Sequence, residues 1–182
     1  MCGKIEPAPI KGHIMFNVGI LTISDKGWHG QRDDESGKMI RSRFSLLDSR
    51  VIKYEIIPDE MDIISHKLTE WADESDVDVI ITTGGTGLSQ RDVTPEATLT
   101  ILDKVVPGFA ETMRAKTFGT TPMAILSRAT AGVRGKCLII NLPGSPKAVE
   151  ECLEVILPTI PHAVEIFKGE VTDHHMNHEE LR

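Results

Sequence analysis

The 182-residue sequence is poor in aromatic residues and cysteine, has no excess of basic charge, and contains no long apolar segment. Because aromatic residues make up only 4% of the chain, the core is expected to be aliphatic. The net charge of −7 argues against a nucleic-acid partner, which would require a basic face. No apolar run approaches the roughly 20 residues that span a bilayer, and no signal peptide is recognisable, so no membrane partner is expected.

The three cysteines, Cys2, Cys137 and Cys152, are odd in number and widely spaced. Their spacing matches neither a disulfide framework nor a zinc site, and it predicts reduced thiols in a cytoplasmic protein. The length predicts a single domain over residues 15–168, preceded by a flexible leader at 1–14 and followed by a polar tail at 169–182. The tail contains a His-His-x-x-His sequence, for which a solvated surface cluster is the favoured interpretation and a metal site the alternative.

Short apolar, β-branched runs alternate with amphipathic segments along the chain. Buried strands are predicted at 17–23, 51–57, 77–81 and 137–142. The spacing of apolar residues predicts helices that begin near residues 36, 60, 94, 107, 146 and 160. This order predicts an α/β fold, a three-layer α/β/α sandwich with a mostly parallel central sheet.

Polar loops follow four of the predicted strands. They are Ser24-Asp25, Pro58-Asp59, the segment 84–92 and the segment 143–147. The carboxyl ends of parallel strands lie at the same edge of a sheet, and ligands of such sheets bind there. The sequence therefore predicts one composite site built from all four loops.

The segment Thr82–Ala97 contains three glycines in four positions, followed by hydroxyl side chains and Arg91. It joins a predicted strand to a predicted helix, for which Thr94 is expected as the N-cap and Pro95 as the first residue. Glycines expose successive backbone amides, which can form an anion-binding nest. The segment matches neither a Walker A motif nor a dinucleotide fingerprint, and a merely structural turn stays open as the alternative.

Two aspartates, Asp59 and Asp92, lie in the converging loops. Each alone is more often a helix cap than a catalytic group. Together they could hold Mg²⁺, which prefers one or two carboxylates with phosphate oxygens and waters. A polyphosphate beside two aspartates would need such a cation, because two unit charges 4 Å apart repel by about 4 kcal/mol at an effective dielectric constant near 20.

The segment Thr82–Ala97 closely resembles the molybdopterin-binding motif of the MogA/MoaB family, which includes the G domain of gephyrin. The resemblance covers about residues 16–167. It extends in the expected order to the segments 19–25, 57–60, 107–109, 124–128 and 141–147. MoeA-type relatives usually carry Gly-Gly-Val-Ser where this chain has Gly-Gly-Thr-Gly, and CinA-type relatives lack the Arg-Asp-x-Thr-Pro-Glu that follows here.

The resemblance implies the molybdopterin-binding fold and a role in molybdenum cofactor biosynthesis. The terminal phosphate of molybdopterin would attack the α-phosphorus of Mg-ATP, giving adenylylated molybdopterin and pyrophosphate. Asp59 and Asp92 would be the catalytic residues and the Mg²⁺ ligands, with Ser24 and Asp25 on the nucleotide side. The residues implied to bind molybdopterin or its phosphate are Thr83, Gly84, Gly85, Thr86, Gly87, Arg91, Thr94, Pro143, Gly144, Ser145 and Lys147.

The resemblance also implies self-association as a homotrimer or hexamer, and hand-over of the product to a molybdenum insertase. The implied reaction agrees with the residues present, because a phosphate nucleophile is already ionised near neutral pH and needs positioning and charge neutralisation more than a base. Two alternatives remain open. The protein could be a molybdopterin-binding carrier or scaffold with little adenylyl transfer, or a generic phosphate hydrolase.

Overall fold

A six-stranded sheet with the order β2-β1-β3-β6-β5-β4 forms the centre of the protein. The computed structural model describes residues 15–74 and 76–169, so the predicted leader and the histidines of the tail lie outside the described residues. The strands are β1 (Phe16–Ile23), β2 (Ser49–Ile57), β3 (Val79–Thr83), β4 (Lys104–Val105), β5 (Ala131–Arg134) and β6 (Cys137–Leu142). The first three strands and β6 pair in parallel, whereas β5 pairs antiparallel with both β6 and β4. The predicted mostly parallel sheet is confirmed, with an antiparallel edge added.

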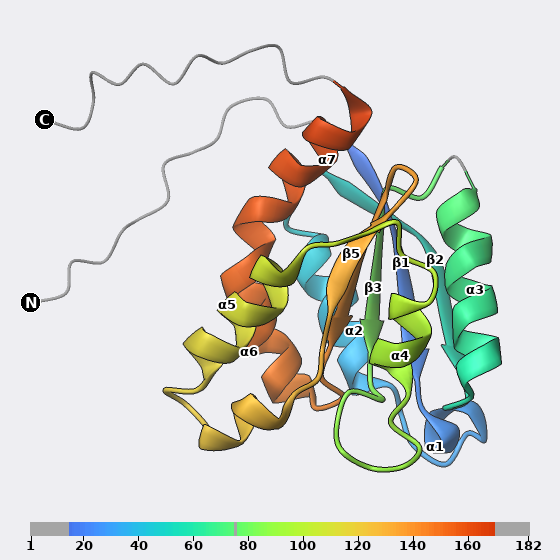
Figure 1. The fold of residues 1–182 in the computed structure, drawn as a ribbon, viewed down its shortest axis with the longest axis vertical. Helices are drawn as coiled ribbons and strands as arrows, with labels where there is room; N and C mark the ends of the chain where they lie inside the picture. Colours follow the sequence, from blue (N-terminus) through green and yellow to red (C-terminus); the bar gives the residue numbers. More distant parts are fainter. Residues whose placement is uncertain (1–14, 75, 170–182) are drawn as a thin grey trace, which may run out of the picture.

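Helices cover both faces of the sheet, as the three-layer prediction requires (Figure 1). One layer contains α2 (Glu35–Phe44), α5 (Pro107–Thr117), α6 (Pro146–Ile156) and α7 (Ile160–Lys168). The other contains α3 (Met61–Asp73) and α4 (Thr94–Leu99). The short helices are α1 (Asp25–Trp28) and the 3₁₀ helices η1 (Pro122–Leu126) and η2 (Leu157–Thr159). None of the helices in the described ranges is long and apolar enough to cross a membrane.

The core is aliphatic and lies in two clusters, one on each side of the sheet. Alternate residues of β1 face opposite layers, so that Val18 and Ile20 pack toward α2 whereas Leu21 packs toward α3. Trp71 is an exception to the aliphatic core, because it places a large aromatic side chain in the second cluster. A Cβ at Gly19 would lie 2.9 Å from the Trp71 ring, so the glycine makes room for the indole.

The order of the strands places a crevice between β1 and β3. After β1 the chain crosses through α2 to β2 at one edge of the sheet, whereas after β3 it crosses through α4 to β4 at the opposite edge. Adjacent strands whose connections leave in opposite directions form a topological switch point, where ligands of doubly wound sheets bind. The loops after β1, β2, β3 and β6 lie at this end of the sheet, as predicted.

Local details of the glycine-rich segment differ from the prediction. The strand β3 ends at Thr83, two residues later than expected, so the segment begins to turn at Gly84. The N-cap of α4 is Val93, and Thr94 is the first helical residue. The prediction of Thr94 as N-cap is wrong because the carbonyl oxygen of Val93 accepts the first helical bond, from the amide of Ala97 (3.0 Å). The amide of Thr94 donates to the carbonyl oxygen of Gly85 (3.1 Å), which closes the loop onto the helix.

Candidate active site

A polar cavity of about 650 Å³ lies over the carboxyl ends of β1 and β3. Its floor comes from the ends of these strands, and its sides come from the start of α2, the glycine loop (residues 84–92) and the loop after β6. The residues that line it are Thr22, Ile23, Ser24, Gly27, Arg32, Asp33, Asp34, Glu35, Ser36, Asp59, Thr83, Gly84, Gly85, Asp92, Gly144, Ser145 and Pro146. We call it the acidic cavity, because its lining includes five carboxylates and one guanidinium.

A second cavity of about 550 Å³ lies on the other side of the glycine loop. It is bounded by α5, η1, α6 and the loop after β6, and apolar side chains such as Met113, Met123 and Leu126 supply much of its wall. We call it the apolar cavity. The two cavities share Gly85, Asp92, Gly144 and Ser145. The two cavities therefore adjoin at these four residues.

The glycines of the loop are required by close approaches. Gly84 has φ +101°, and a Cβ there would lie 2.2 Å from the carbonyl oxygen of Ile23. Gly85 has φ +62°, and a Cβ there would lie 2.2 Å from Oγ1 of the buried Thr94 and 3.2 Å from Oδ1 of Asp59. At Gly87 a Cβ would lie 3.0 Å from Oδ2 of Asp92. Gly85 thus makes room chiefly for Thr94, and Gly85 and Gly87 also leave space for the two aspartates that the sequence singled out.

Asp59 is held by a reciprocal pair of backbone hydrogen bonds with Asp25. The amide of Asp25 donates to Oδ2 of Asp59 (2.8 Å), and the amide of Asp59 donates to Oδ1 of Asp25 (3.1 Å). Burial raises the pKa of the Asp59 carboxyl, the Asp25 amide partly opposes this, and the charges of Asp25 and Asp92 raise it further. Asp59 was considered as a helix cap, but α3 begins after Glu60 without a side-chain cap. The carboxylate points to the site instead.

Asp92 lies on the wall that both cavities share. Its Oδ2 accepts a hydrogen bond from the amide of Ser89 (2.7 Å), and its own amide donates to the carbonyl oxygen of Ser89 (3.0 Å). This small turn fixes the position of the carboxylate within the loop. Asp92 is therefore a member of the acidic cavity and a boundary of the apolar cavity.

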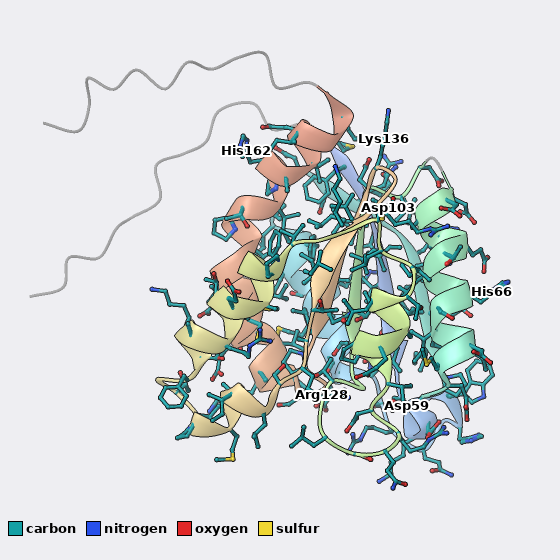
Figure 2. The ribbon with its side chains drawn as sticks, in the orientation of Figure 1. Asp59, His66, Asp103, Arg128, Lys136 and His162 are labelled. Carbon is teal, nitrogen blue, oxygen red and sulfur yellow. The ribbon has the colours of Figure 1, made fainter. Side chains whose placement is uncertain are left out.

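Arg128 connects both limbs of the glycine loop. Its Nε donates to the carbonyl oxygen of Gly87 (2.7 Å), and an Nη donates to the carbonyl oxygen of Asp92. Its other Nη pairs with Glu96 in the first turn of α4, and its backbone amide donates to the carbonyl oxygen of Thr86 (3.0 Å). Figure 2 shows Arg128 at the same end of the sheet as Asp59. The planar guanidinium holds the returning limb against the outgoing limb and so positions Asp92.

Replacing Arg128 by lysine is expected to lower the turnover number (kcat) of the site by about tenfold. A lysine keeps the charge but cannot bridge two carbonyl oxygens and a carboxylate with one rigid group. The matched control is Arg134→Lys, because Arg134 bonds the carbonyl oxygen of Ile101 (3.0 Å) and the carboxylate of Asp73 (2.8 and 2.9 Å) in the same way. Neither Arg134 nor its partners line the two cavities.

Steady-state kinetics and thermal melts of both lysine variants make the comparison. If both variants lose similar stability but only Arg128→Lys loses kcat, the result would support positioning of the loop by Arg128. Equal kcat values in the two variants would contradict it.

The structure brings most of the predicted site residues into the cavities, but not all. Asp25 does not line either cavity, and its amide donates to the carboxylate of Asp59. Arg91 donates to Asp25 (3.0 Å) and to Glu60 (2.7 Å) and lines neither cavity. The pKa of Asp25 is lowered: burial opposes the shift, but the Asp59 amide and the Arg91 guanidinium outweigh it. Thr94 is fully buried. Lys147 has a side chain 80% exposed and lies 3.9 Å from Glu151.

Sequence reasoning missed the contribution of α2. Asp34 accepts hydrogen bonds from the Thr22 hydroxyl (2.6 Å) and from the Gly37 amide (2.8 Å), and Tyr54 donates to it as well. It thereby caps α2, and the Ser36 hydroxyl donates to the carbonyl oxygen of Gly144 (2.8 Å). An aspartate just before a helical pattern is an N-cap signal, so the cap could have been predicted, whereas its place in the cavity could not.

The carboxylate oxygens of the acidic cavity suit a divalent cation that also binds water and phosphate oxygens. Within the described residues, no group of three or more histidine, cysteine, aspartate or glutamate side chains is arranged to hold a metal ion. Asp59 and Asp92 nevertheless line the same cavity, and burial, together with the charges of Asp25 and Asp92, raises the pKa of Asp59. Two carboxylates with room for phosphate oxygens and water match the preference of Mg²⁺.

Fold and site together define the class of the protein. It is a doubly wound α/β domain with one cavity over the switch point of the sheet and a second cavity beside it. The family described as "Probable molybdopterin binding domain" matches residues 19–162. The chain belongs to this molybdopterin-binding family, as its resemblance predicted.

Individual relatives agree with this membership. The molybdopterin adenylyltransferase of Helicobacter pylori strain J99 is 46% identical over 156 residues, which cover 85% of this chain and 89% of that protein. The molybdopterin adenylyltransferase of Escherichia coli K12 is 36% identical over 168 residues, covering 85% and 86%. The crystal structure of the molybdopterin biosynthesis enzyme MoaB from Thermus thermophilus has a TM-score of 0.81 at 52% identity, and covers 85% of this chain and 98% of that one.

Proposed function

We propose that this protein is a molybdopterin adenylyltransferase of molybdenum cofactor biosynthesis. An oxygen of the terminal phosphate of molybdopterin attacks the α-phosphorus of ATP, the bond from the α-phosphorus to the bridging oxygen breaks, and pyrophosphate leaves. The observation that supports this most is the wall shared by the two cavities. A reaction between two large substrates needs two adjoining sites with one meeting point, and Asp92 lies at that point.

In this proposal ATP occupies the acidic cavity and the pterin occupies the apolar cavity. Ser24 and Asp59 line the first, Thr86, Gly87 and Pro143 line the second, and the shared residues hold the reacting phosphates. Asp59 and Asp92 would hold Mg²⁺, which when bound neutralises charge on the phosphates of ATP. The protein's own task is to hold both phosphates in line, through amides of the glycine loop and of the loop after β6.

Incubation of the protein with molybdopterin and Mg-ATP tests the proposal. Formation of adenylylated molybdopterin with an equal amount of pyrophosphate is the expected result. Binding of molybdopterin without release of pyrophosphate would favour a carrier or scaffold instead. Hydrolysis of ATP that does not depend on molybdopterin would point to a phosphate hydrolase.

Replacing Asp59 by asparagine is expected to raise the Mg²⁺ concentration needed for half-maximal turnover by about 10- to 100-fold. Asparagine can still accept the bond from the Asp25 amide (2.8 Å) but removes one negative charge from the cavity. Because the pKa of Asp59 is raised, protons compete with the cation at higher pH than at an ordinary aspartate, so the wild-type requirement for Mg²⁺ should grow as pH falls. The variant should lose most of this pH dependence.

Pyrophosphate release measured against Mg²⁺ concentration at several pH values gives the result. Asp78→Asn is the matched control, because Oδ2 of Asp78 likewise accepts a backbone amide, that of Asn17 (2.7 Å), away from both cavities. An unchanged Mg²⁺ requirement in Asp59→Asn would remove Asp59 from the proposed cation site.

The proposal includes the domain limits, the assembly and the compartment. The folded unit is 15–168, and self-association as a homotrimer or hexamer would cover exposed apolar residues of η1, such as Met123 and Ile125, which are 64% and 63% exposed. Hand-over of the product to a molybdenum insertase is the expected next step. Burial raises the pKa of the free thiols of Cys137 and Cys152 to about 12 and about 11, which fits reduced cysteines in the cytoplasm.

A further inference from the structure

The apolar cavity has three charged residues in its lining: Asp92, Arg114 and Glu151. Two of them already have partners. Asp92 accepts the Ser89 amide, and Nη1 of Arg114 donates to the carbonyl oxygens of Ser127 (3.2 Å) and Ala129 (3.0 Å). The carboxylate of Glu151 differs from both, because its neighbour in the described structure is the well-exposed Lys147 at 3.9 Å.

The surroundings of Glu151 call for a partner from a ligand. Its side chain is 21% exposed, and it belongs to a cavity whose wall includes the apolar residues Met113, Ala148 and Cys152. At 21% exposure the carboxylate still meets water, and a ligand that fills the cavity would have to replace that water with hydrogen-bond donors. The 3.9 Å distance to Lys147 is beyond hydrogen-bonding range, and a flexible surface ammonium contributes little.

We propose that Glu151 recognises the 2-amino-4-oxopyrimidine edge of the pterin ring. This inference rests on the proposed function, in which the apolar cavity takes the pterin. The ring presents N3–H and the 2-amino group side by side, two donors that match the two oxygens of a carboxylate in parallel, charge-assisted hydrogen bonds. The flat ring would lie against the aliphatic wall, and the rest of the molecule would extend toward the shared wall and Asp92.

The same contact explains why the two substrates occupy different cavities. Adenine presents its amino donor beside N1, which is an acceptor. A carboxylate can accept from the amino group but faces the lone pair of N1, so it opposes adenine in this orientation. Glu151 is therefore a specificity-determining residue that admits the pterin to the apolar cavity and leaves ATP to the acidic cavity.

Two simple ring compounds test the contact without molybdopterin. Pterin carries the 2-amino group, whereas lumazine carries a 2-oxo group at the same position and so offers an acceptor where pterin offers a donor. The wild-type protein is expected to bind pterin about 10- to 100-fold more tightly than lumazine, the range for one charge-assisted hydrogen bond gained or lost. Fluorescence titration of each compound at pH 7 gives the dissociation constants.

Glu151→Gln should remove or reverse this preference. The glutamine amide has nearly the same shape, and it offers one acceptor and one donor, which suit N3–H and the 2-oxo group of lumazine. Glu150→Gln is the matched control on the same helix, because Glu150 does not line the cavity and its carboxylate lies 4.0 Å from Arg43. The control should keep the wild-type preference, and thermal melts should show both variants folded.

An unchanged ratio of the two dissociation constants in Glu151→Gln would overturn the inference, as would a wild-type protein that does not prefer pterin. These failures are distinguishable from failure of the proposed function. If wild-type protein still forms adenylylated molybdopterin, only the role of Glu151 is lost. If the pterin preference depends on Glu151 but no pyrophosphate is released, the recognition stands and the transfer activity does not.

Discussion

Asp92→Asn is expected to lower kcat for adenylyl transfer by about 10²- to 10³-fold, the range observed when one preorganised electrostatic group is removed from an active site. Asp92 is the ionisable side chain common to the linings of both cavities. The oxygen of an asparagine can still accept the hydrogen bond from the Ser89 amide (2.7 Å), so the loop should keep its shape. The variant thus removes the charge and leaves the fold and most pterin binding in place.

Pyrophosphate release at saturating Mg-ATP and molybdopterin measures the loss. Asp103→Asn is the matched control, since Oδ2 of Asp103 also accepts a backbone amide, that of Gly135 (2.7 Å). Figure 2 shows Asp103 at the end of the sheet opposite to Asp59. The control should turn over like the wild type. Equal turnover of Asp92→Asn and wild type would refute the assignment of Asp92.

Gly84→Ala is expected to destabilise the protein by about 3 kcal/mol and to weaken ligand binding, because Gly84 lines the acidic cavity and lies beside Gly144 of the shared wall. The left-handed φ of +101° disfavours any side chain, at a cost of about 1–2 kcal/mol. The 2.2 Å approach of the new Cβ to the carbonyl oxygen of Ile23 adds a further cost of about 1–3 kcal/mol, because both partners are backbone of the central sheet. Denaturant unfolding and pterin titration measure the two effects.

A glycine with a similar φ but open surroundings supplies the control. Gly135 has φ +57° in the turn between β5 and β6, and a Cβ there would meet nothing within 4 Å. Gly135→Ala should therefore cost only the conformational part, about 1–2 kcal/mol. If both variants lost the same stability, the close approach at Ile23 would not be what requires Gly84.

The strands and the convergence of their loops were predictable because each depends on neighbouring residues. A short apolar run bounded by turn residues, such as 137–142, favours a strand from its local sequence, and parallel strands bring Asp59 and the glycine loop to one edge. The predicted residues that line the cavities, including Asp92, lie in the loops that follow those strands. The helix after Ser36 was likewise found from its apolar spacing, with Ile40 and Phe44 buried as expected.

Features that depend on distant partners could not be predicted. Arg128 is separated by 41 residues from Gly87, whose carbonyl oxygen it binds, and no local pattern marks that contact. Arg91 was expected to bind phosphate, but Asp25, 66 residues away, takes its guanidinium. The glycine-rich loop is interpreted as a cradle for an anion, and the sequence did not indicate that Gly85 also makes room for the Thr94 hydroxyl and the Asp59 carboxylate. Each of these contacts joins residues that local patterns do not connect.

The packing of Trp71 at Gly19 has a practical consequence for optical measurements. The sequence contains two tryptophans, and they lie in opposite environments. Trp71 is 3% exposed in the core, whereas Trp28 is 54% exposed at the end of α1, next to Gly27 of the acidic cavity. Emission from Trp71 should shift when the sheet opens, and emission from Trp28 should respond to a nucleotide. A Trp28→Phe protein would therefore report folding alone, and the difference from wild type would isolate the signal of the occupied cavity.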